Sequence, residues 1–242
     1  MPTLPKWIAN GIEKVFSGMM HPVSVTQTEM LAPQLKRVRF EGDLSQSHFI
    51  PGQVVEFRIS DTEYRHYTPS AYEPSAGACE VLFYLHGLGP GSNWASQLDS
   101  GYVTKLMGPG GKMKLRETQT RHLLFGDESS LGFCLQMAEA IKARRQAYFC
   151  LLELDRAHQH WPGILGLSTE MVPALAEAPG QNAIKHLSSW LKEAEPAWTQ
   201  AACYLTGRAA SIKLLRKHLI KQGISSPQIQ SLPYWAKGKV GI

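Results

Sequence analysis

Short runs in which apolar and polar positions alternate fill the chain from residue 22 to about residue 118. In residues 54–59, for example, every second side chain is large and apolar, which is the period of a half-buried β-strand. Glycine, proline and serine separate the runs, as they do between the strands of antiparallel sheets. The pattern predicts a six-stranded antiparallel β-barrel, with strands at residues 23–30, 34–40, 54–59, 80–86, 103–107 and 112–115.

The pattern changes near Gln119, where near-continuous apolar runs begin to alternate with stretches of helical periodicity. A run such as residues 148–152 has no polar face, so a strand formed from it must be buried on both sides. This alternation is typical of a doubly wound parallel sheet covered by helices. The expected strands are 122–125, 147–154, 201–205 and 229–235, and the expected helices are 131–143, 184–193 and 209–221.

The predicted fold class is therefore β + α/β, in three segments. They are an N-terminal amphipathic helix and extension over residues 1–21, the barrel over residues 22–118, and a nucleotide-binding type α/β domain over residues 119–242. Apolar residues recur at helical spacing between Pro5 and Phe16, which favours a short helix packed on the body of the protein. Proline and glycine in residues 165–179 predict an irregular connector there.

Composition narrows the functional classes. The 242 residues are 43% hydrophobic and 19% charged, which is ordinary for a folded protein, and the net charge of +5 with a pI of about 9.0 suits an anionic cofactor or substrate. No long basic run indicates nucleic-acid binding, and no apolar run is long enough to predict membrane insertion. The four cysteines lack C-x-x-C spacing and predict buried thiols in a reducing compartment, not a metal site. We expect a cytoplasmic monomer.

The first candidate site is Arg65-His66-Tyr67-Thr68, which follows the predicted strand at residues 54–59. In an extended chain Arg65 and Tyr67 point the same way. A guanidinium can then hold an anionic group while the neighbouring ring stacks on a planar one, as flavin binding requires. The alternative is a strand end with an exposed arginine and a tyrosine packed on the sheet.

The second candidate is the glycine-rich loop from His86 to Ala95, which follows the predicted strand at residues 80–86. Its glycines, Gly87 and Gly91 among them, leave room for a phosphate to approach the backbone, and Ser92 can cap a short helix from residue 93 to about residue 98. Such a loop suits the pyrophosphate of a dinucleotide. A capped helix with no ligand is the alternative.

The third candidate is Gly126-Asp127-Glu128-Ser129, at the junction between a buried strand and a helix where doubly wound folds place phosphates. The two acidic side chains either cap the helix or meet ribose hydroxyls. At the next strand end, residues 153–158 contain both acids and an arginine, so they do not distinguish a free ribose hydroxyl from a 2′-phosphate. We interpret His158 and His160 as a solvated loop rather than a metal pair.

Together these motifs resemble a known family. Arg65-His66-Tyr67-Thr68 is similar to the flavin motif of the ferredoxin reductase superfamily. Within that superfamily, the 86–95 loop, the 126–129 junction and the terminal Tyr234-Trp235-Ala-Lys237-Gly238 resemble the siderophore-interacting proteins, the bacterial ferric-siderophore reductases. The likeness runs from about residue 23 to residue 238.

The resemblance implies an FAD-dependent oxidoreductase that passes electrons from NADH or NADPH, or from a donor such as ferredoxin, to a ferric siderophore and so releases Fe(II). It assigns Arg65 to an FAD phosphate, and Tyr67 and Thr68 to the redox centre. It assigns His86, Gly87, Gly91, Ser92, Trp94 and Ala95 to the rest of the FAD path, and Gly126, Asp127, Glu128 and Ser129 to the nicotinamide cofactor.

Two departures from the family pattern stand out. Thr206-Gly207-Arg208 replaces the Ala-Gly-Glu that the family often carries, and the sequence ends at Ile242, before an extension that some relatives place near the active site. We expect Arg208, Lys237 and Lys239 to dock the anionic ferric chelate. A general NAD(P)H:flavin or ferredoxin-type reductase, or a flavin electron-transfer subunit with another acceptor, stays open as an alternative.

Overall fold

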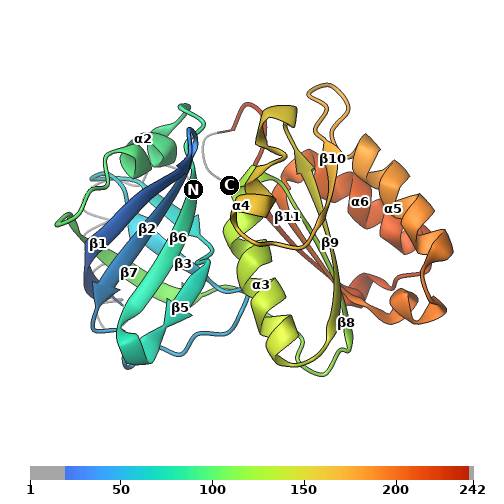
Figure 1. Cartoon of the computed structure of the whole chain (residues 1–242), viewed down its shortest axis with the longest axis horizontal. Coiled ribbons are helices and arrows are strands. Elements are labelled where there is room, and N and C mark those ends of the chain that lie inside the picture. The colour runs from blue at the N-terminus through green and yellow to red at the C-terminus, as the bar shows by residue number, and fades with distance from the viewer. Residues whose placement is uncertain (1–19, 240–242) are drawn as a thin grey trace. The chain divides into compact units, whose positions relative to one another are not determined.

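The computed structural model describes residues 20–239, so the helix predicted between Pro5 and Phe16 lies outside the described residues. The chain forms two compact units, which divide between Lys114 and Leu115 (Figure 1). Sequence patterning put the change of architecture near Gln119. We describe each unit by itself.

The first unit is a seven-stranded antiparallel sheet with the strand order β4-β3-β7-β1-β2-β6-β5. Its strands are β1 (Met20–Ala32), β2 (Leu35–Gly42), β3 (Val54–Arg58), β4 (Tyr64–Tyr67), β5 (Ala71–Glu73), β6 (Ala78–Tyr84) and β7 (Val103–Gly110). Strand β6 is preceded by a 3-10 turn, η2 (Pro74–Ala76), and followed by helix α2 (Pro90–Ser96).

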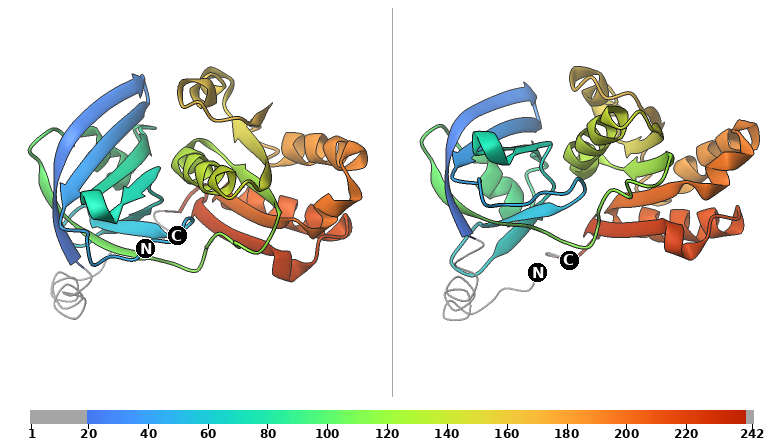
Figure 2. Two further views of the ribbon diagram at one scale, coloured as in Figure 1. Left: turned by 60° about the horizontal axis from the view of Figure 1, so that its bottom comes forward. Right: turned by 90° about the horizontal axis from the view of Figure 1, so that it is seen from below.

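This sheet is curled into a barrel. Its two edge strands, β4 and β5, are joined by the short step from Tyr67 to Ala71, and an extended chain covers at most about 14 Å in that distance. Seven strands laid flat would hold their edges about 29 Å apart. The two edges therefore lie close together, and the sheet bends as Figure 2 shows.

Alternating side chains from the strands fill the barrel. Val55 and Phe57 of β3 are fully buried, and the ring of Phe57 lies 4.7 Å from that of Phe40 on β2. Leu98, just after α2, is also fully buried in this cluster. The helix is thus held against the barrel by apolar packing, which fixes the loop that precedes it.

The antiparallel barrel is confirmed, with two corrections to its strands. The structure has seven strands instead of six because the short β4 and β5 pair with β3 and β6. The strand expected at residues 112–115 is wrong, since that segment leaves the sheet and has no ladder partner. Helix α2 begins at Pro90, three residues before the predicted start.

The second unit is a five-stranded parallel sheet with the order β10-β9-β8-β11-β12. Its strands are β8 (Arg121–Gly126), β9 (Ala147–Leu154), β10 (Glu170–Pro173), β11 (Ala202–Arg208) and β12 (Ile229–Trp235). The helices are α3 (Leu131–Ala143), α4 (Trp161–Ile164), α5 (Gln181–Glu193) and α6 (Ala209–Lys221). The 3-10 segments are η3 (Glu128–Ser130), η4 (Arg156–His158), η5 (Pro196–Gln200) and η6 (Ser226–Gln228).

Helices cover both faces of this sheet: α3 lies on one face, and α5 and α6 lie on the other (Figure 1). Successive side chains of β8 point to opposite faces of the sheet. Leu123 and Phe125 pack toward α5 and α6, while Leu124 points to the other face. The doubly wound parallel sheet is therefore confirmed. The connector at residues 165–179 contains β10, a short strand that its proline content did not reveal.

The strand order reverses between β8 and β11, which makes their carboxyl ends the topological switch point of the sheet. In open α/β sheets, ligands bind in the crevice outside the carboxyl ends of the strands at such a point. The loop after β8 and the end of β11 are therefore the positions where a ligand of this unit is expected.

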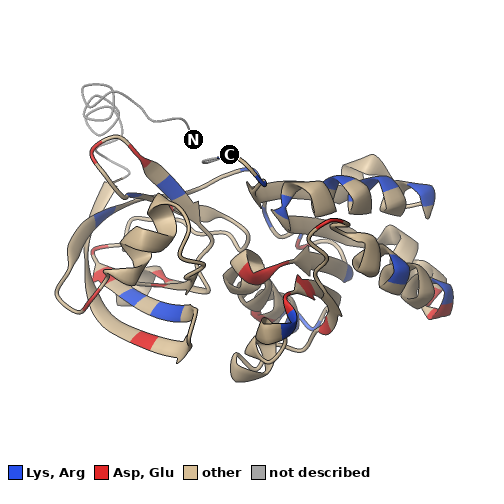
Figure 3. Cartoon of the chain, turned by 90° about the horizontal axis from the view of Figure 1, so that it is seen from above, with Lys and Arg blue, Asp and Glu red and all other residues tan. Residues whose placement is uncertain are grey.

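The four cysteines, Cys79, Cys134, Cys150 and Cys203, are all buried and free, as their apolar surroundings predicted. Among residues 20–239, no helix is long and apolar enough to cross a membrane. Lysine and arginine positions are spread over α5 and α6, including Lys213, Lys217 and Lys221 on α6 (Figure 3). Part of the positive charge therefore lies along these two helices.

Candidate functional site

Arg65 and Tyr67 lie on β4, the edge strand that pairs with β3 and places Phe57 opposite Arg65 and Val55 opposite Tyr67. The sequence put these residues at the end of the preceding strand, but they form a strand of their own. Alternation along β4 puts Arg65 and Tyr67 on one face, while His66 is exposed on the other. The structure thus supports the shared orientation that flavin binding requires.

The Arg65 guanidinium is held by two contacts. One terminal nitrogen donates to the Tyr64 carbonyl at 2.8 Å, and the other forms an ion pair with the Glu63 carboxylate at 3.0 Å. Both side chains are about 15% exposed. Sequence reasoning missed Glu63, although an acid two positions before an arginine on a strand points to the same face and was a readable signal.

The Tyr67 ring is half-buried and packs on the barrel core. Its centroid lies 4.7 Å from that of Phe83 in an edge-on arrangement and 6.3 Å from that of Trp94 in a stacked one. Burial raises the pKa of the Tyr67 hydroxyl well above its usual value, and the charge of Arg65 only partly opposes this. The side chain is therefore a neutral phenol whose ring position is fixed by packing.

The glycine-rich loop meets the Arg65 motif at Gly91. A Cβ added to Gly91 would lie 2.8 Å from the Tyr67 hydroxyl and 3.4 Å from Cγ of Arg65, so only glycine leaves those two side chains where they are. The Ser92 hydroxyl, 8% exposed, accepts the Gly87 N–H at 3.1 Å. Residues far apart in the sequence are thus brought together by the helix that follows β6.

The remaining predicted residues of this site occupy different environments. His86 is exposed, and its Nδ1 accepts the Leu88 N–H at 3.1 Å. Thr68 is 7% exposed. Trp94 and Ala95 are buried in the barrel core, 7% and 1% exposed, so a ligand could meet these two residues mainly through their backbone.

At the carboxyl edge of the parallel sheet, Asp127 follows β8 and is buried. Its carboxylate accepts the Ser129 N–H at 3.0 Å, the Ser129 hydroxyl at 2.5 Å and the Trp235 indole N–H at 2.8 Å. Burial raises the pKa of Asp127 to about 6, against the hydrogen bonds from Ser129 and Trp235. Asp127 therefore caps the turn after β8, as one of the two interpretations of its sequence predicted.

Gly207 of β11 stands against Asp127 at the switch point. Its φ is +96°, and a Cβ at this position would lie 2.5 Å from the Asp127 carboxylate. The neighbouring Thr206 hydroxyl donates to the Phe125 carbonyl at 3.0 Å, which ties the end of β11 to β8. Gly126, the last residue of β8, packs in the same way against the side chain of Ser130.

Glu128 turns away from this cluster toward the next strand end. Its carboxylate accepts the Asp155 N–H at 2.6 Å and lies 3.0 Å from Nδ1 of His158. The prediction that His158 belongs to a solvated loop is wrong: it is 7% exposed and stacks on Trp161 at 4.1 Å. The imidazole is buried because it bridges the ends of β8 and β9.

Glu153, near the end of β9, is also buried. Its carboxylate accepts the Gly180 N–H at 2.7 Å and the Ser211 hydroxyl at 2.6 Å, and burial raises its pKa. These bonds leave Glu153 a structural role between β9, α5 and α6, rather than a role in contacting ribose.

The three basic residues expected to dock the substrate differ in exposure. The Arg208 guanidinium is half-buried and donates to the carbonyls of Leu175 and Ala176, whereas Lys237 is 73% exposed and pairs with Glu177 at 3.6 Å. Lys239 is exposed. Of the three, the two lysines expose their charged groups most to solvent, although Lys237 is paired with Glu177.

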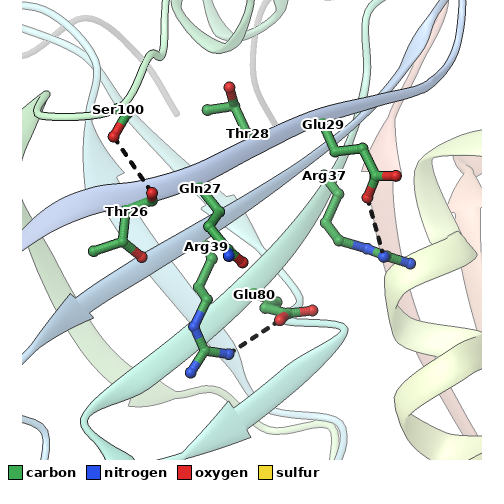
Figure 4. A pocket seen from close by; sticks show the side chains of 8 residues that line it. All are labelled: Thr26, Gln27, Thr28, Glu29, Arg37, Arg39, Glu80 and Ser100. Atoms are coloured by element: carbon green, nitrogen blue, oxygen red, sulfur yellow. Dashed lines mark hydrogen bonds and ion pairs between the residues drawn. The ribbon is translucent and has the colours of Figure 1, made fainter.

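A separate surface pocket lies on the outer face of β1, β2 and β6 (Figure 4). Its charged residues neutralise one another, since Arg37 pairs with Glu29 at 3.4 Å and Arg39 pairs with Glu80 at 3.1 Å. None of the predicted site residues lines it. We therefore keep the Arg65 motif and the switch point as the candidate sites.

Comparison with known families places both units of the chain. A family model described as siderophore-interacting FAD-binding domain matches residues 58–113, and one described as siderophore-interacting protein matches residues 119–238. The chain belongs to the siderophore-interacting protein family. The first match covers the Arg65 motif and the glycine-rich loop, and the second covers the switch point. No curated protein sequence matches the chain significantly.

Solved structures of two siderophore-interacting proteins and of one siderophore utilization protein share the fold. The siderophore-interacting protein of Acinetobacter baumannii is 15% identical, with a TM-score of 0.70 over 90% of this chain and 91% of that one. SipS from Aeromonas hydrophila is 17% identical, with a TM-score of 0.72 over 90% and 98%. A siderophore utilization protein from T. fusca is 20% identical, with a TM-score of 0.70 over 92% and 95%.

The same fold occurs in reductases outside the family. The ferredoxin reductase in carbazole 1,9a-dioxygenase is 18% identical, with a TM-score of 0.73 over 89% of this chain and 69% of that one. Family membership and fold together support an FAD-dependent oxidoreductase.

The residues of the first unit fit FAD. A cationic side chain, a packed aromatic ring and a glycine that clears both of them converge at one edge of the barrel. A phosphate and a planar ring system are the two chemical features of FAD that such a set can hold.

Proposed function

We propose that this protein is a ferric-siderophore reductase that passes electrons from NADH or NADPH through FAD to Fe(III), and so releases Fe(II) in the cytoplasm. The observation that carries the proposal is the position of Gly91 against both Arg65 and Tyr67, in the segment that matches the siderophore-interacting FAD-binding domain. It supports a single site built from the two flavin motifs.

In this proposal Arg65 binds a phosphate of FAD. Its guanidinium is already oriented by the Tyr64 carbonyl and the Glu63 carboxylate, and a planar fork keeps further N–H groups for a second anion. An FAD phosphate would therefore share Arg65 with Glu63. Glu63 therefore partly neutralises the charge of Arg65 before FAD binds.

Tyr67 supplies a neutral aromatic surface for the isoalloxazine. Because its phenol stays protonated across the physiological range, it places no negative charge beside a flavin that takes up electrons. The rings of Phe83 and Trp94 keep it in place. We assign Thr68, the next residue, to the reacting edge of the flavin, as the family resemblance implies.

FAD supplies the chemistry that the chain itself lacks, since it accepts a hydride and gives up electrons one at a time. One reduced nicotinamide and two Fe(III) ions then yield oxidised nicotinamide, one proton and two Fe(II) ions. Oxygen ligands of the siderophore bind Fe(II) far more weakly than Fe(III), so the metal is released without a protein ligand. The chain has only to hold the donor and the chelate.

The donor is proposed to bind at the switch point of the parallel sheet, where Gly126, Asp127, Glu128 and Ser129 form the turn after β8. The Asp127 carboxylate is occupied by Ser129 and Trp235, so we assign it to shaping the turn. The backbone groups of the turn are then the groups that contact the nicotinamide electron donor. The choice among NADH, NADPH and ferredoxin is an outcome of the test below.

The ferric chelate is proposed to approach exposed positive charge. Lys237 and Lys239 meet that requirement better than Arg208, whose guanidinium is engaged with carbonyls. Anionic chelates are steered by such charges at low ionic strength. A monomer suffices for this reaction, since the described residues supply both proposed binding sites.

Anaerobic mixing of the flavin-loaded protein with each donor tests the proposal. The proposal predicts that NADH or NADPH bleaches the yellow flavin. It also predicts that adding a ferric siderophore restores the colour and produces Fe(II), which a chelator traps. Bleaching without reoxidation by any ferric siderophore would instead support a reductase that serves another acceptor. An unbleached flavin with both nucleotides, but a bleached one with reduced ferredoxin, would move the donor role to ferredoxin.

A further inference from the structure

The segment that joins β10 to α5, residues 174–180, crosses the carboxyl edge of the parallel sheet, and we call it the edge loop. Its two ends are fixed: the Ala174 N–H donates to the Leu154 carbonyl at 2.8 Å, and the Gly180 N–H donates to the Glu153 carboxylate at 2.7 Å. Residues 175–177, which lie between these ends, are exposed. Apolar packing therefore does not hold the middle of the loop.

Arg208, the last residue of β11, holds that middle. Its two terminal nitrogens donate to the carbonyl of Leu175 at 3.4 Å and to that of Ala176 at 3.0 Å. The other tie is the pair of Lys237 and Glu177 at 3.6 Å, with both side chains more than 70% exposed. Exposed pairs of this kind contribute little, so Arg208 is the principal tie.

In the described part of the chain, Arg208 forms no ion pair with an acid; the acid that responds to its charge is Glu153, whose pKa burial raises and Arg208 partly lowers, while the Glu153 carboxylate accepts hydrogen bonds from Gly180 and Ser211. Among residues 20–239, no carboxylate lies within ion-pair distance of it, and its Nε is buried without a hydrogen-bond partner. Its guanidinium lies 5.4 Å over the ring of Trp235, which orients it but adds no negative charge. Neutral carbonyls are weaker acceptors for a guanidinium than an anion is.

This under-neutralised cation stands where anions are expected. Arg208 ends β11, one of the two strands that flank the switch point, and a dinucleotide bound there brings a pyrophosphate to the same edge. A phosphate accepts two parallel N–H bonds from arginine and would compete directly with the two carbonyls. The residue that anchors the edge loop is thus the residue that an incoming phosphate would contact.

We propose that Arg208 binds a phosphate of the nicotinamide dinucleotide by leaving the carbonyls of Leu175 and Ala176, so that donor binding releases the edge loop. The inference rests on the proposed function, because it takes the donor to be a dinucleotide. It gives Arg208 a role in donor binding in place of the docking of the ferric chelate that its charge first suggested. Lys237 and Lys239 keep that docking role.

Titration calorimetry of the flavin-loaded full chain with NAD⁺ and with NADP⁺ tests the binding half. Arg208→Gln should weaken at least one dinucleotide about tenfold, as expected for the loss of a charge-assisted hydrogen bond. A loss of affinity for both dinucleotides would mean that Arg208 contacts the pyrophosphate. A loss of affinity for NADP⁺ alone would mean that it contacts the 2′-phosphate. Arg216→Gln is the matched control, since Arg216 also donates to carbonyls, those of Ile229 and Ser226.

Cleavage after Glu177 by a glutamate-specific protease tests the release half. The dinucleotide should speed cleavage of the wild-type edge loop about tenfold, because cleavage follows the population of the open segment. Arg208→Gln should be cleaved at the faster rate without nucleotide and should not respond to it. Sodium chloride at matched ionic strength controls for screening.

The outcomes of these experiments distinguish a failure of this inference from a failure of the proposed function. If the wild type binds a dinucleotide and Arg208→Gln binds it equally well, the phosphate contact is wrong and the proposed function stands. If the dinucleotide binds but leaves the cleavage rate unchanged, the release of the loop is wrong. If the wild type binds neither dinucleotide, the proposed donor fails and this inference fails with it.

Discussion

The indole N–H of Trp235 donates to the buried carboxylate of Asp127 at 2.8 Å, and this bond joins the last strand of the parallel sheet to the turn after its first strand. It also fixes the ring over which the Arg208 guanidinium lies. This hydrogen bond therefore connects three features: the turn after β8, where the electron donor is expected to bind, Arg208, which holds the edge loop, and strand β12.

Ionisation of Asp127 should be visible in the Trp235 indole resonance. Burial raises the pKa of Asp127 to about 6, so the ¹⁵N–¹H shift of that indole should titrate with a midpoint near pH 6, as the bond to a carboxylate replaces the bond to a carboxylic acid. In Asp127→Asn the shift should stay flat. A flat wild-type shift between pH 4 and pH 8 would place the titration elsewhere.

The same pKa shift has a consequence for stability. A carboxyl whose folded-state pKa lies above its usual value of 3.8 stabilises the fold below that pH, and the benefit is lost as the pH rises through about 6. The unfolding free energy of the wild type should therefore fall relative to that of Asp127→Asn over this window, by up to about 3 kcal/mol. A constant difference would contradict the burial argument.

Gly91→Ala should weaken FAD binding. The added methyl group would meet the Tyr67 hydroxyl at 2.8 Å and push the ring from its packed position. Stacking is worth about 0.5–1.5 kcal/mol, so the affinity should fall by up to roughly tenfold in a flavin fluorescence titration. Gly110→Ala is the control, because nothing lies within 4 Å of its added Cβ. Equal losses in both variants would mean that the barrel, not the site, was disturbed.

Glu63→Gln should tighten FAD binding. Glu63 pairs with Arg65 at 3.0 Å and competes with a phosphate for the guanidinium. Removing its charge should raise the affinity about fivefold, equivalent to about 1 kcal/mol, with a larger gain at low salt. A weaker affinity would show instead that Glu63 serves mainly to orient Arg65.

His122 should make the α/β unit sensitive to acid. Its Nε2 lies 3.1 Å from both the Gln119 carbonyl and the Gln146 side-chain oxygen, and its Nδ1 lies 3.4 Å from the Tyr204 hydroxyl, so the neutral ring donates on one side and accepts on the other. Burial lowers the pKa of His122 below 6.5. The unfolded chain therefore takes up a proton first as the pH falls through 6.5, and stability decreases.

Comparison with His122→Gln isolates this effect. The unfolding free energy of the wild type minus that of the variant should rise from pH 5 to pH 8, since the other titrating groups are common to both. Chemical denaturation at several pH values measures it. A difference that falls with pH would mean that the imidazole is charged in the folded protein.

Long periodic segments could be predicted closely from the sequence. Helix α3 and strand β12 begin and end at the predicted residues because their own patterns define them over many positions. Strands β4, β5 and β10 could not be predicted, since each has only three or four residues and is defined by the strand it pairs with. Short strands depend on tertiary pairing more than on their own pattern.

The candidate site shows the same limit. The residue types of the Arg65 motif and the glycine-rich loop were readable, but their meeting at Gly91 depends on how α2 packs on the barrel. The burial of His158 likewise depends on Glu128, which comes from a different strand end. Contacts between distant segments decide such details.

Flavin content after purification tests the central claim most directly. The wild type should bind FAD in a 1:1 ratio, read from its visible absorbance, whereas the double variant Arg65→Ala, Tyr67→Ala should lose most of it because it lacks both the charge-assisted contact and the stacking surface. Arg37→Ala, at the surface pocket of Figure 4, should keep the full content. A double variant that kept its full yellow colour would contradict the assignment of this site to FAD.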